Sequence, residues 1–150
     1  MSANQIDEIL DYAIEREQGA HDFYTELAAR METVAMKEIF RQFAAEEMGH
    51  KAKLQSIKQG KRLVPQPGKI LDLKIADYLV DVDPAAALDY QKALILAMKR
   101  EKASFRLYSD LANAAATADL RDTFLALAQE EAKHKLRFEV EYDEWVLTEN

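Results

Sequence analysis

The sequence predicts an all-α protein, a four-helix bundle of two antiparallel hairpins with a long crossover between the second and third helices. Apolar residues recur at alternating steps of four and three, which is the spacing of one helix face and not that of a strand. The 150 residues include only 4 Gly and 3 Pro, too few for a fold with many tight turns. A chain of this length can bury a substantial core, so we expect a single domain over residues 1–150.

The first predicted hairpin covers residues 3–58 and holds two helices. The first helix places apolar residues on one face, at Ile6, Leu10, Ala13, Ala20 and Leu27. The second helix does the same, at Met36, Phe40, Phe43, Leu54 and Ile57. The join between them, residues 30–33, is short, and a short join makes neighbouring helices antiparallel.

The second predicted hairpin covers residues 84–146. Asp83 and Pro84 suit the cap and the first turn of its opening helix. The apolar face of that helix comprises Tyr90, Leu94, Ala97 and Leu111. The apolar face of the last helix comprises Leu120, Phe124, Leu127 and Phe138. Because the join at residues 115–117 is again short, these two helices are also expected to be antiparallel.

Residues 59–83 differ from the rest, because they contain Pro65, Pro67 and Gly68 and then an apolar run at 70–80. A connection this long lets the second and third helices run parallel, since it can travel the length of a bundle, about 35–40 Å for a helix of about 25 residues. The alternative is a flexible linker between two separate hairpins. Because residues 70–80 are too apolar to remain solvated, we favour the crossover of one bundle.

The two hairpins repeat one another. Moving the chain by 84 positions superimposes the same residue types without a gap: Arg16-Glu17 on Arg100-Glu101, Tyr24 on Tyr108, Phe40 on Phe124, Glu46-Glu47 on Glu130-Glu131, and His50-Lys51 on His134-Lys135. A duplicated hairpin explains this match, and it predicts a bundle with two-fold pseudosymmetry.

Each predicted helix directs a glutamate at the core. The helical spacing of core positions continues through four glutamates, which are Glu17, Glu47, Glu101 and Glu131. The second and fourth helices add a histidine three residues later on the same face, His50 and His134. The two glutamates of each hairpin lie equally far from its join, so pseudosymmetry brings all six side chains together in the middle of the bundle.

A buried cluster of four carboxylates needs compensating charge, because burying even one isolated carboxylate costs many kcal/mol. Two divalent cations would cancel four glutamates while both histidines stay neutral. One Glu from each of two helices and Glu-x-x-His from each of the other two form the ligand set of di-iron bundles. The sequence therefore predicts two iron ions, with manganese or zinc as substitutes, and any catalysis would run through these metals. A single Glu-x-x-His is often a surface accident, but a second copy at the equivalent core position argues against that reading.

Four further residues are candidates for supporting the ligands. Tyr24 and Tyr108 occupy core-facing positions, close enough for a hydroxyl to bond a liganding carboxylate. The alternative is that both tyrosines only fill the core. Glu46 and Glu130 could each orient the ring N–H of a histidine across the bundle, or they could be solvated surface residues.

These segments resemble the rubrerythrin family of the ferritin-like superfamily. The matching motifs are Glu17-x6-Tyr24, Glu46-Glu47-Met48-Gly49-His50, Glu101-x6-Tyr108 and Glu130-Glu131-Ala132-Lys133-His134. The resemblance covers nearly the whole chain and implies a ferritin-like bundle whose di-iron centre reacts with hydrogen peroxide or dioxygen, using electrons from an external donor. It also implies a homodimer, since long crossovers of this type permit the exchange of helices between subunits.

The sequence departs from the family pattern at two points. Rubrerythrins typically carry another carboxylate three residues after the first ligand of the third helix, and here that residue is Ser104. The set of six ligands is therefore more similar to that of bacterioferritin, and we expect His50 and His134 to stay bound in both oxidation states. The chain has no Cys, so it lacks the rubredoxin-like domain of full-length rubrerythrins and would need a separate donor, such as a rubredoxin-like protein.

Charge and hydropathy argue against other classes of function. The net charge of −7 disfavours binding to nucleic-acid phosphates, and no run of about 18 apolar residues could cross a membrane. We expect a soluble, cytoplasmic protein. The first functional hypothesis is an oxidoreductase, a peroxidase that reduces hydrogen peroxide. The alternatives are a ferroxidase or iron-storage protein of bacterioferritin type, and a redox-inert binding module that a metal stabilises.

Overall fold

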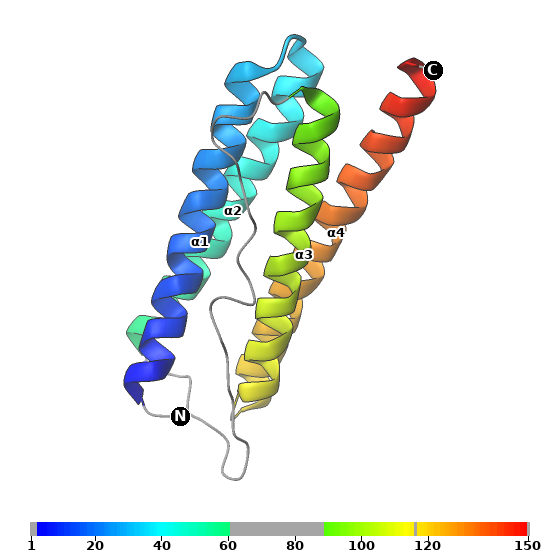
Figure 1. Cartoon of the computed structure of the whole chain (residues 1–150). Coiled ribbons are helices and arrows are strands. Elements are labelled where there is room, and N and C mark those ends of the chain that lie inside the picture. The colour runs from blue at the N-terminus through cyan, green and yellow to red at the C-terminus, as the bar shows by residue number, and fades with distance from the viewer. Residues whose placement is uncertain (1–2, 61–88, 116, 150) are drawn as a thin grey trace.

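The computed structural model describes residues 3–60, 89–115 and 117–149, which form a four-helix bundle (Figure 1). The helices are α1 (Ala3–Arg30), α2 (Val34–Gly60), α3 (Tyr90–Ala114) and α4 (Ala118–Glu149). One hairpin consists of α1 and α2, and the other of α3 and α4. The structure thus confirms the predicted all-α bundle of two hairpins. The crossover predicted for residues 59–83 lies outside the described residues except at its first two positions.

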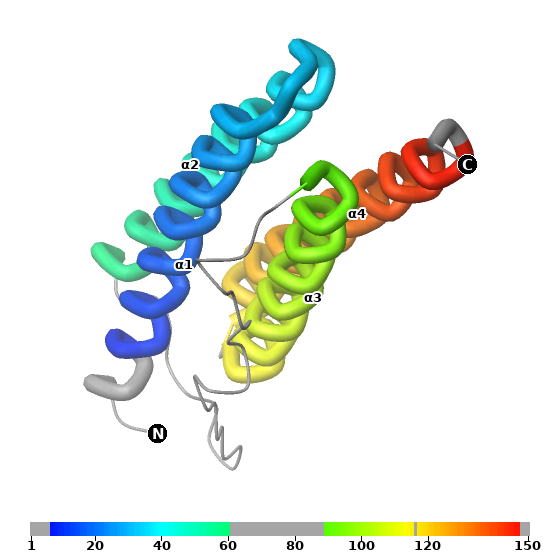
Figure 2. The backbone as a smooth tube through the Cα atoms, turned by 45° about the horizontal axis from the view of Figure 1, so that its top comes forward, coloured from blue at the N-terminus to red at the C-terminus, as the bar shows by residue number. Residues whose placement is uncertain are grey.

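The second and third helices run in the same direction. In Figures 1 and 2, the C-terminal end of α2 and the N-terminal end of α3 lie at opposite ends of the bundle. Contacts between the hairpins also show the relative direction of α1 and α3. Tyr24 of α1 meets Glu101 of α3, whereas Glu17, earlier in α1, meets Tyr108, later in α3. Helices α1 and α3 are therefore antiparallel.

Threonine side chains begin two of the helices. Thr33 and Thr117 lie directly before α2 and α4, and each hydroxyl accepts a hydrogen bond of 3.2 Å from the backbone N–H three residues further on. Such caps satisfy backbone donors that the first turn of a helix leaves unpaired. The same displacement of 84 positions relates the two threonines, so the internal repeat includes the start of the second helix of each hairpin.

Helix α3 begins later than the sequence predicts. Asp89 has an extended backbone, with φ −81° and ψ 175°, and its side chain accepts a 2.8 Å hydrogen bond from the N–H of Lys92. This cap makes Tyr90 the first helical residue, in place of the predicted Pro84, which lies outside the described residues. Helices α2 and α4 end at 60 and 149, slightly beyond the predicted 58 and 146, which is ordinary variation for helix ends.

The core consists of two apolar blocks with a polar layer between them. One block is mainly aliphatic, and its large members include Leu10, Leu54, Leu107, Leu111, Phe124 and Leu127. The other block is mainly aromatic, and its large members include Tyr24, Phe40, Phe43, Tyr90 and Phe138. Burial of apolar surface, at about 25 cal/mol per Å², is the main force that holds the hairpins together. The two packed blocks fix the level of the polar layer.

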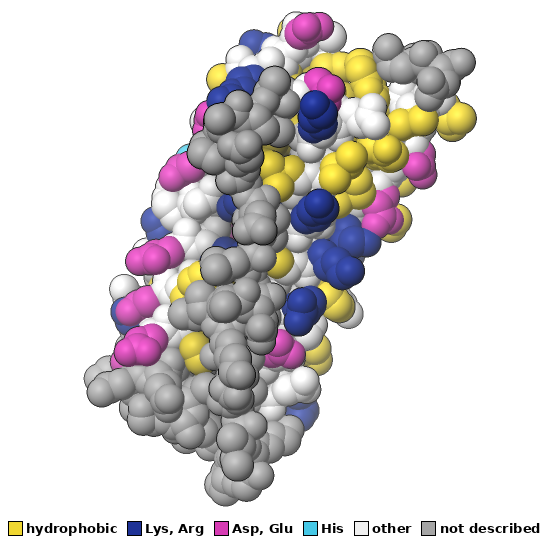
Figure 3. Space-filling view, in the orientation of Figure 1, with side chains coloured by type: hydrophobic (Ala, Val, Ile, Leu, Met, Phe, Trp, Pro, Cys, Tyr) yellow, Lys and Arg dark blue, Asp and Glu magenta, His cyan; other side chains and the backbone are white. Residues whose placement is uncertain are grey.

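The outer faces of the helices carry the charges. Figure 3 shows acidic side chains along α1 and basic side chains along α3 and α4 on one face of the bundle. Most large apolar side chains of the described residues are turned to the core instead. None of the four described helices has an apolar stretch long enough to cross a membrane.

Candidate metal centre

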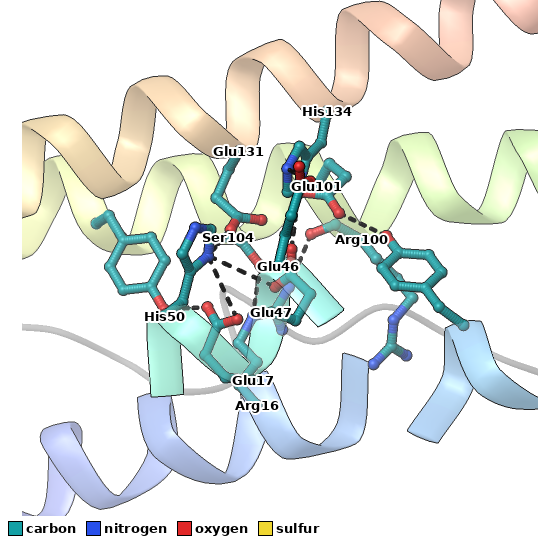
Figure 4. A network of polar contacts seen from close by, with 12 residues as sticks. Arg16, Glu17, Glu46, Glu47, His50, Arg100, Glu101, Ser104, Glu131 and His134 are labelled. Atoms are coloured by element: carbon teal, nitrogen blue, oxygen red, sulfur yellow. Dashed lines mark hydrogen bonds and ion pairs between the residues drawn. The ribbon is translucent and has the colours of Figure 1, made fainter. Parts of the chain in front are cut away.

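The polar layer is formed by six side chains that the sequence predicts to be metal ligands (Figure 4). They are Glu17 of α1, Glu47 and His50 of α2, Glu101 of α3, and Glu131 and His134 of α4. The four glutamates are at most 2% exposed, and the two histidines are 7% and 4% exposed. The structure therefore brings all six together inside the bundle, because each occupies a core-facing position of its helix.

The potential ligand atoms fall into two groups that share two residues. Within each group the atoms lie within 4.8 Å of one another: Glu17, Glu47, His50 and Glu131 in one group, and Glu47, Glu101, Glu131 and His134 in the other. Glu47 and Glu131 belong to both groups, whereas the other four residues belong to one each. This arrangement suits two metal ions bridged by two carboxylates, each ion with one further glutamate and one histidine.

Both histidine rings turn their Nδ1 atom towards the cluster. His50 Nδ1 lies 2.7 Å from Glu131 Oε1 and 3.6 Å from Glu17 Oε2. His134 Nδ1 lies 3.0 Å from Glu47 Oε1. The two rings are stacked, with their centroids 5.9 Å apart. Each histidine thus presents one nitrogen to carboxylates from other helices, as a metal ligand would.

The chemistry of the cluster fits a pair of metal ions. Several of its buried atoms that face the cluster make no hydrogen bond of good geometry: Glu17 Oε2, Glu47 Oε1, His50 Nδ1, Glu101 Oε2, both oxygens of Glu131, and His134 Nδ1. Leaving buried polar atoms unsatisfied is costly, and bound cations would satisfy those that face the cluster. Carboxylate oxygen and imidazole nitrogen together suit iron or manganese, and zinc competes for the same ligands.

Burial and mutual repulsion shift the pKa values of the carboxyl groups. Burial raises the pKa of Glu47 and of Glu131 well above 4.5, and the nearby charge of Glu101 adds to the effect. Burial acts in the same direction on Glu101, but hydrogen bonds with Glu131 and His134 outweigh it and lower the pKa of Glu101. In the metal-free protein these shifts favour the protonated form of Glu47 and of Glu131, and bound cations would displace the protons.

Two buried tyrosines hold the unshared glutamates. Tyr24 on α1 donates a 2.5 Å hydrogen bond to Glu101 Oε1 on α3, and Tyr108 on α3 donates one to Glu17 Oε1 on α1. Each bond uses one carboxylate oxygen and leaves the other, Oε2, facing a histidine of the cluster. Both tyrosines therefore do more than fill the core, and the pair follows the pseudosymmetry of the chain.

The two adjacent glutamates, Glu46 and Glu130, differ from one another. Glu46 Oε2 lies 2.6 Å from His134 Nε2, the ring nitrogen that faces away from the cluster. A carboxylate in this position fixes the tautomer and the orientation of a liganding histidine. Glu130 is exposed, and no ion pair joins it to His50 in the described part of the chain. The structure therefore breaks the pseudosymmetry that the sequence predicts at this pair.

Two arginines beside the centre are missing from the sequence-based prediction. Arg16 Nε donates a 3.0 Å hydrogen bond to Ser104 Oγ, and Arg16 Nη2 donates one of 2.9 Å to the backbone oxygen of Arg100. The guanidinium of Arg100 lies over the ring of Phe23, 4.6 Å from the ring centroid. The repeated Arg-Glu pair at 16–17 and 100–101 could have indicated that both arginines lie beside the centre. Arginines next to core positions, however, usually remain in solvent.

A narrow recess between α1 and α3 reaches the centre. Its lining includes both arginines, two small residues and three carboxylates of the cluster: Arg16, Ala20, Tyr24, Glu47, Arg100, Glu101, Ser104 and Glu131. The recess encloses about 190 Å³, part of which is open solvent. Ala20 and Ser104 occupy equivalent positions of the repeat, and their small side chains leave this gap beside the ligands.

Comparisons with known proteins agree with this geometry. The sequence matches the model of the rubrerythrin family over residues 8–142. The structure is similar to that of a hypothetical protein from Pyrococcus furiosus, with a TM-score of 0.72, 26% identity, and coverage of 95% of this chain and 89% of that chain. It is also similar to a protein from Thermotoga maritima, provisionally described as a ferritin-like diiron-carboxylate protein, with a TM-score of 0.75, 21% identity and 96% of both chains covered. No curated protein matched the sequence.

The fold and the cluster together define a ferritin-like four-helix bundle with a Glu/His site able to bind metal. Because the family match extends over residues 8–142, the chain belongs to the rubrerythrin family. Membership of this family implies iron as the metal. These 150 residues contain no Cys, so they carry no rubredoxin-type iron site beside the bundle.

Proposed function

We propose that the protein is a di-iron oxidoreductase that reduces hydrogen peroxide, or dioxygen, with electrons from an external donor. The observation that carries this proposal is the buried pair of ligand groups sharing Glu47 and Glu131, in a chain of the rubrerythrin family. Glu17 and His50 would complete the ligands of one ion, and the equivalent residues of the second hairpin those of the other. The two iron ions would supply the two electrons that cleave an O–O bond.

The chain's own residues contribute positioning and exclusion of water. Tyr24 and Tyr108 hold the two unshared glutamates in fixed orientations, and Glu46 holds the ring of His134. The apolar blocks on either side keep the carboxylates at most 2% exposed, so interactions between charges are strong there. The recess beside Ala20 and Ser104 has no room for a water-sized molecule, so a substrate the size of peroxide would enter there only when its lining side chains move aside.

We propose a separate molecule as the electron donor. The chain offers no Cys for a second iron site, so a rubredoxin-like protein is the donor that we propose. We also propose a cytoplasmic homodimer. Light scattering tests the dimer, which a 24-subunit particle would contradict, and cell fractionation tests the location.

An anaerobic kinetic experiment tests the proposed reaction. The protein is loaded with Fe(II) and mixed with hydrogen peroxide or with dioxygen, and the rate of iron oxidation is followed for each. We expect faster oxidation by peroxide, and repeated turnover once a reduced rubredoxin-like protein is added. A centre that oxidises only with dioxygen and then accumulates ferric mineral would contradict peroxide reduction.

A ferroxidase is the second candidate, and one observation favours it. Ser104 stands where rubrerythrins typically have a further carboxylate, which leaves the six-ligand set that is more similar to that of bacterioferritin. Ferroxidase activity uses the same centre to oxidise Fe(II) as a substrate, and storage needs a hollow assembly. The third candidate, a redox-inert binding module, predicts a zinc site and no reaction of the reduced protein with peroxide.

A further inference from the structure

The two ends of the bundle differ in a way that the repeat does not explain. Aromatic rings fill the block next to Tyr24, whereas mainly aliphatic side chains fill the block next to Tyr108. Residues at equivalent positions of the repeat show the difference: Phe43 corresponds to Leu127, and Phe138 corresponds to Leu54. Tyr108 and Phe124 match Tyr24 and Phe40, but leucines at the other two positions show that the bundle also packs with aliphatic side chains there.

The aromatic block contains a continuous row of rings that leads away from the centre. The ring centroids of Tyr24 and Phe40 are 6.2 Å apart, and those of Phe40 and Tyr90 are 6.0 Å apart. The row ends at Trp145, whose ring meets Tyr90 edge-on at 5.3 Å. All three spacings are those of rings in direct contact. In the described part of the chain, no equivalent row starts from Tyr108.

The two ends of the row have the environments that an electron route needs. At the inner end, the hydroxyl of Tyr24 is bonded to Glu101, a member of the cluster. At the outer end, Trp145 is half-buried and lines a surface hollow of about 480 Å³, including its open mouth, together with Met31 and Asp89. Trp145 is also the single tryptophan of the sequence, so its redox state can be observed without interference from another indole.

Tyr90, in the middle of the row, has a proton acceptor of its own. Its hydroxyl donates a 3.0 Å hydrogen bond to Glu141 Oε2 on α4. Burial and the charge of Glu141 raise the pKa of Tyr90, so the phenol keeps its proton at neutral pH. A phenol becomes much easier to oxidise when its proton can pass to a neighbouring base at the moment the electron leaves. Glu141 is placed to accept that proton and to return it afterwards.

We propose that Trp145, Tyr90 and Tyr24 form a one-electron relay that connects the surface of the bundle with its centre, with Phe40 as the bridging ring between the two tyrosines. The direction of flow rests on the proposed function, in which peroxide is the oxidant and an external protein is the reductant. The relay itself rests on the ring contacts and on the hydrogen bonds at Tyr24 and Tyr90.

Electrons and protons balance in this relay. Tyr24 gives one electron towards the centre and regains it from Tyr90, which regains it from Trp145, and the surface donor restores Trp145. Each tyrosine passes its phenolic proton to its bonded carboxylate as it is oxidised and takes it back as it is reduced. Two such transfers restore to the centre the two electrons that one peroxide, with two protons, takes from it on becoming two molecules of water.

Flash photolysis of the zinc-loaded protein tests the outer step without any iron chemistry. A ruthenium polypyridyl photo-oxidant removes one electron from Trp145, and the absorption bands of the tryptophan and tyrosine radicals are followed. We expect the tryptophan radical to decay as a tyrosine radical grows. Tyr90→Phe should slow this decay by at least about tenfold. Tyr12→Phe, beside the aliphatic block, should leave it unchanged.

The inner step is tested in the iron-loaded protein without a donor and with peroxide in excess over iron, so that oxidation continues after the two irons have given up their own electrons. Trp145 should then be oxidised, with loss of its fluorescence, and Tyr24→Phe should prevent this, while Tyr12→Phe, on the same helix beside the aliphatic block, does not. Equal radical decay in wild type and Tyr90→Phe overturns the outer step, and equal fluorescence loss in wild type and Tyr24→Phe overturns the inner one. If peroxide does not oxidise the iron at all, the proposed function fails, whereas the zinc measurement still decides the relay.

Discussion

Arg16 and Ser104 are joined across the bundle by a 3.0 Å hydrogen bond, from the guanidinium Nε on α1 to the hydroxyl on α3. The same guanidinium donates to the backbone oxygen of Arg100 and to the hydroxyl of Tyr12. Ser104 lies one turn after Glu101 and is 7% exposed. The position at which related proteins carry a further carboxylate therefore faces a fixed cation in this structure.

Replacement of Ser104 by a carboxylate should therefore change the reduction potential of the metals only when Arg16 is also replaced. In Ser104→Glu the new carboxylate pairs with Arg16, and we expect a reduction potential close to that of the wild type. In the double variant with Arg16→Gln the carboxylate is free to bind ferric iron. The reduction potential of the iron should then fall by on the order of 60 mV. A fall of this size corresponds to a tenfold increase in the affinity for ferric iron relative to ferrous iron, for each electron transferred. Redox titration measures this, with Arg16→Gln alone as the control, and an equal fall in the single variant would contradict the pairing.

Metal stoichiometry should distinguish the shared ligands from the unshared ones. The wild type is expected to bind two ions, one in each ligand group. Glu17→Ala removes a ligand from one group only and should leave about one ion, whereas Glu47→Ala removes a ligand from both groups and should lose most of the metal. Metal analysis after iron reconstitution tests this. Equal losses in the two variants would contradict the assignment of Glu47 as a bridge.

Glu46 should matter for metal binding, and Glu130 should not. Glu46→Gln removes the carboxylate that fixes the ring of His134, so we expect about 10- to 100-fold weaker metal binding, the usual effect of losing such a partner. Glu130→Gln changes an exposed residue at the equivalent position of the repeat and serves as the matched control. Competition with a chelator measures both affinities. An equal loss in the two variants would show that His134 does not depend on Glu46.

The metal-free protein should become less stable as the pH rises. Burial raises the pKa of Glu47 and Glu131 above the ordinary value of 4.5, so from that pH upwards these two groups bind more protons in the folded chain than in the unfolded chain. The free energy of unfolding therefore falls with pH until the raised pKa values are passed. Urea unfolding at about pH 5 and about pH 8 tests this sign.

A variant and a metal-loaded sample complete the pH experiment. The double variant Glu47→Gln, Glu131→Gln removes both titrating groups and should show a flatter pH dependence. Metal binding displaces the protons, so metal-loaded protein should gain relative stability as the pH rises. If the metal-free wild type is instead stabilised by raising the pH, these two glutamates do not hold protons in the folded state.

Much of the fold and of the candidate site follows from periodicity. A core-facing position is fixed by the spacing of apolar residues, so a glutamate on that spacing, such as Glu17 or Glu131, must lie inside the bundle. The internal repeat then places the two hairpins at one level. The six cluster residues and their tyrosine partners can therefore be predicted without any side-chain detail.

Other features depend on packing that the pattern does not contain. Arg16 lies next to a core position, and only the gap beside Ser104 draws its guanidinium inward. Glu46 and Glu130 are equivalent in the repeat, yet the bundle brings only Glu46 to a histidine. The start of α3 also differs from the prediction. Asp83-Pro84 is as good a cap signal as Asp89, and the sequence alone does not show which of the two caps the helix.

Anomalous diffraction from crystals of the iron-loaded protein tests the central claim most directly. The account predicts two iron peaks in the polar layer, with metal–ligand distances of about 2.0–2.2 Å. One ion should be bound by Glu17 and His50, and the other by Glu101 and His134. Both ions should also be bound by Glu47 and Glu131, which belong to both groups. A single ion, or iron bound outside this cluster, would contradict the account.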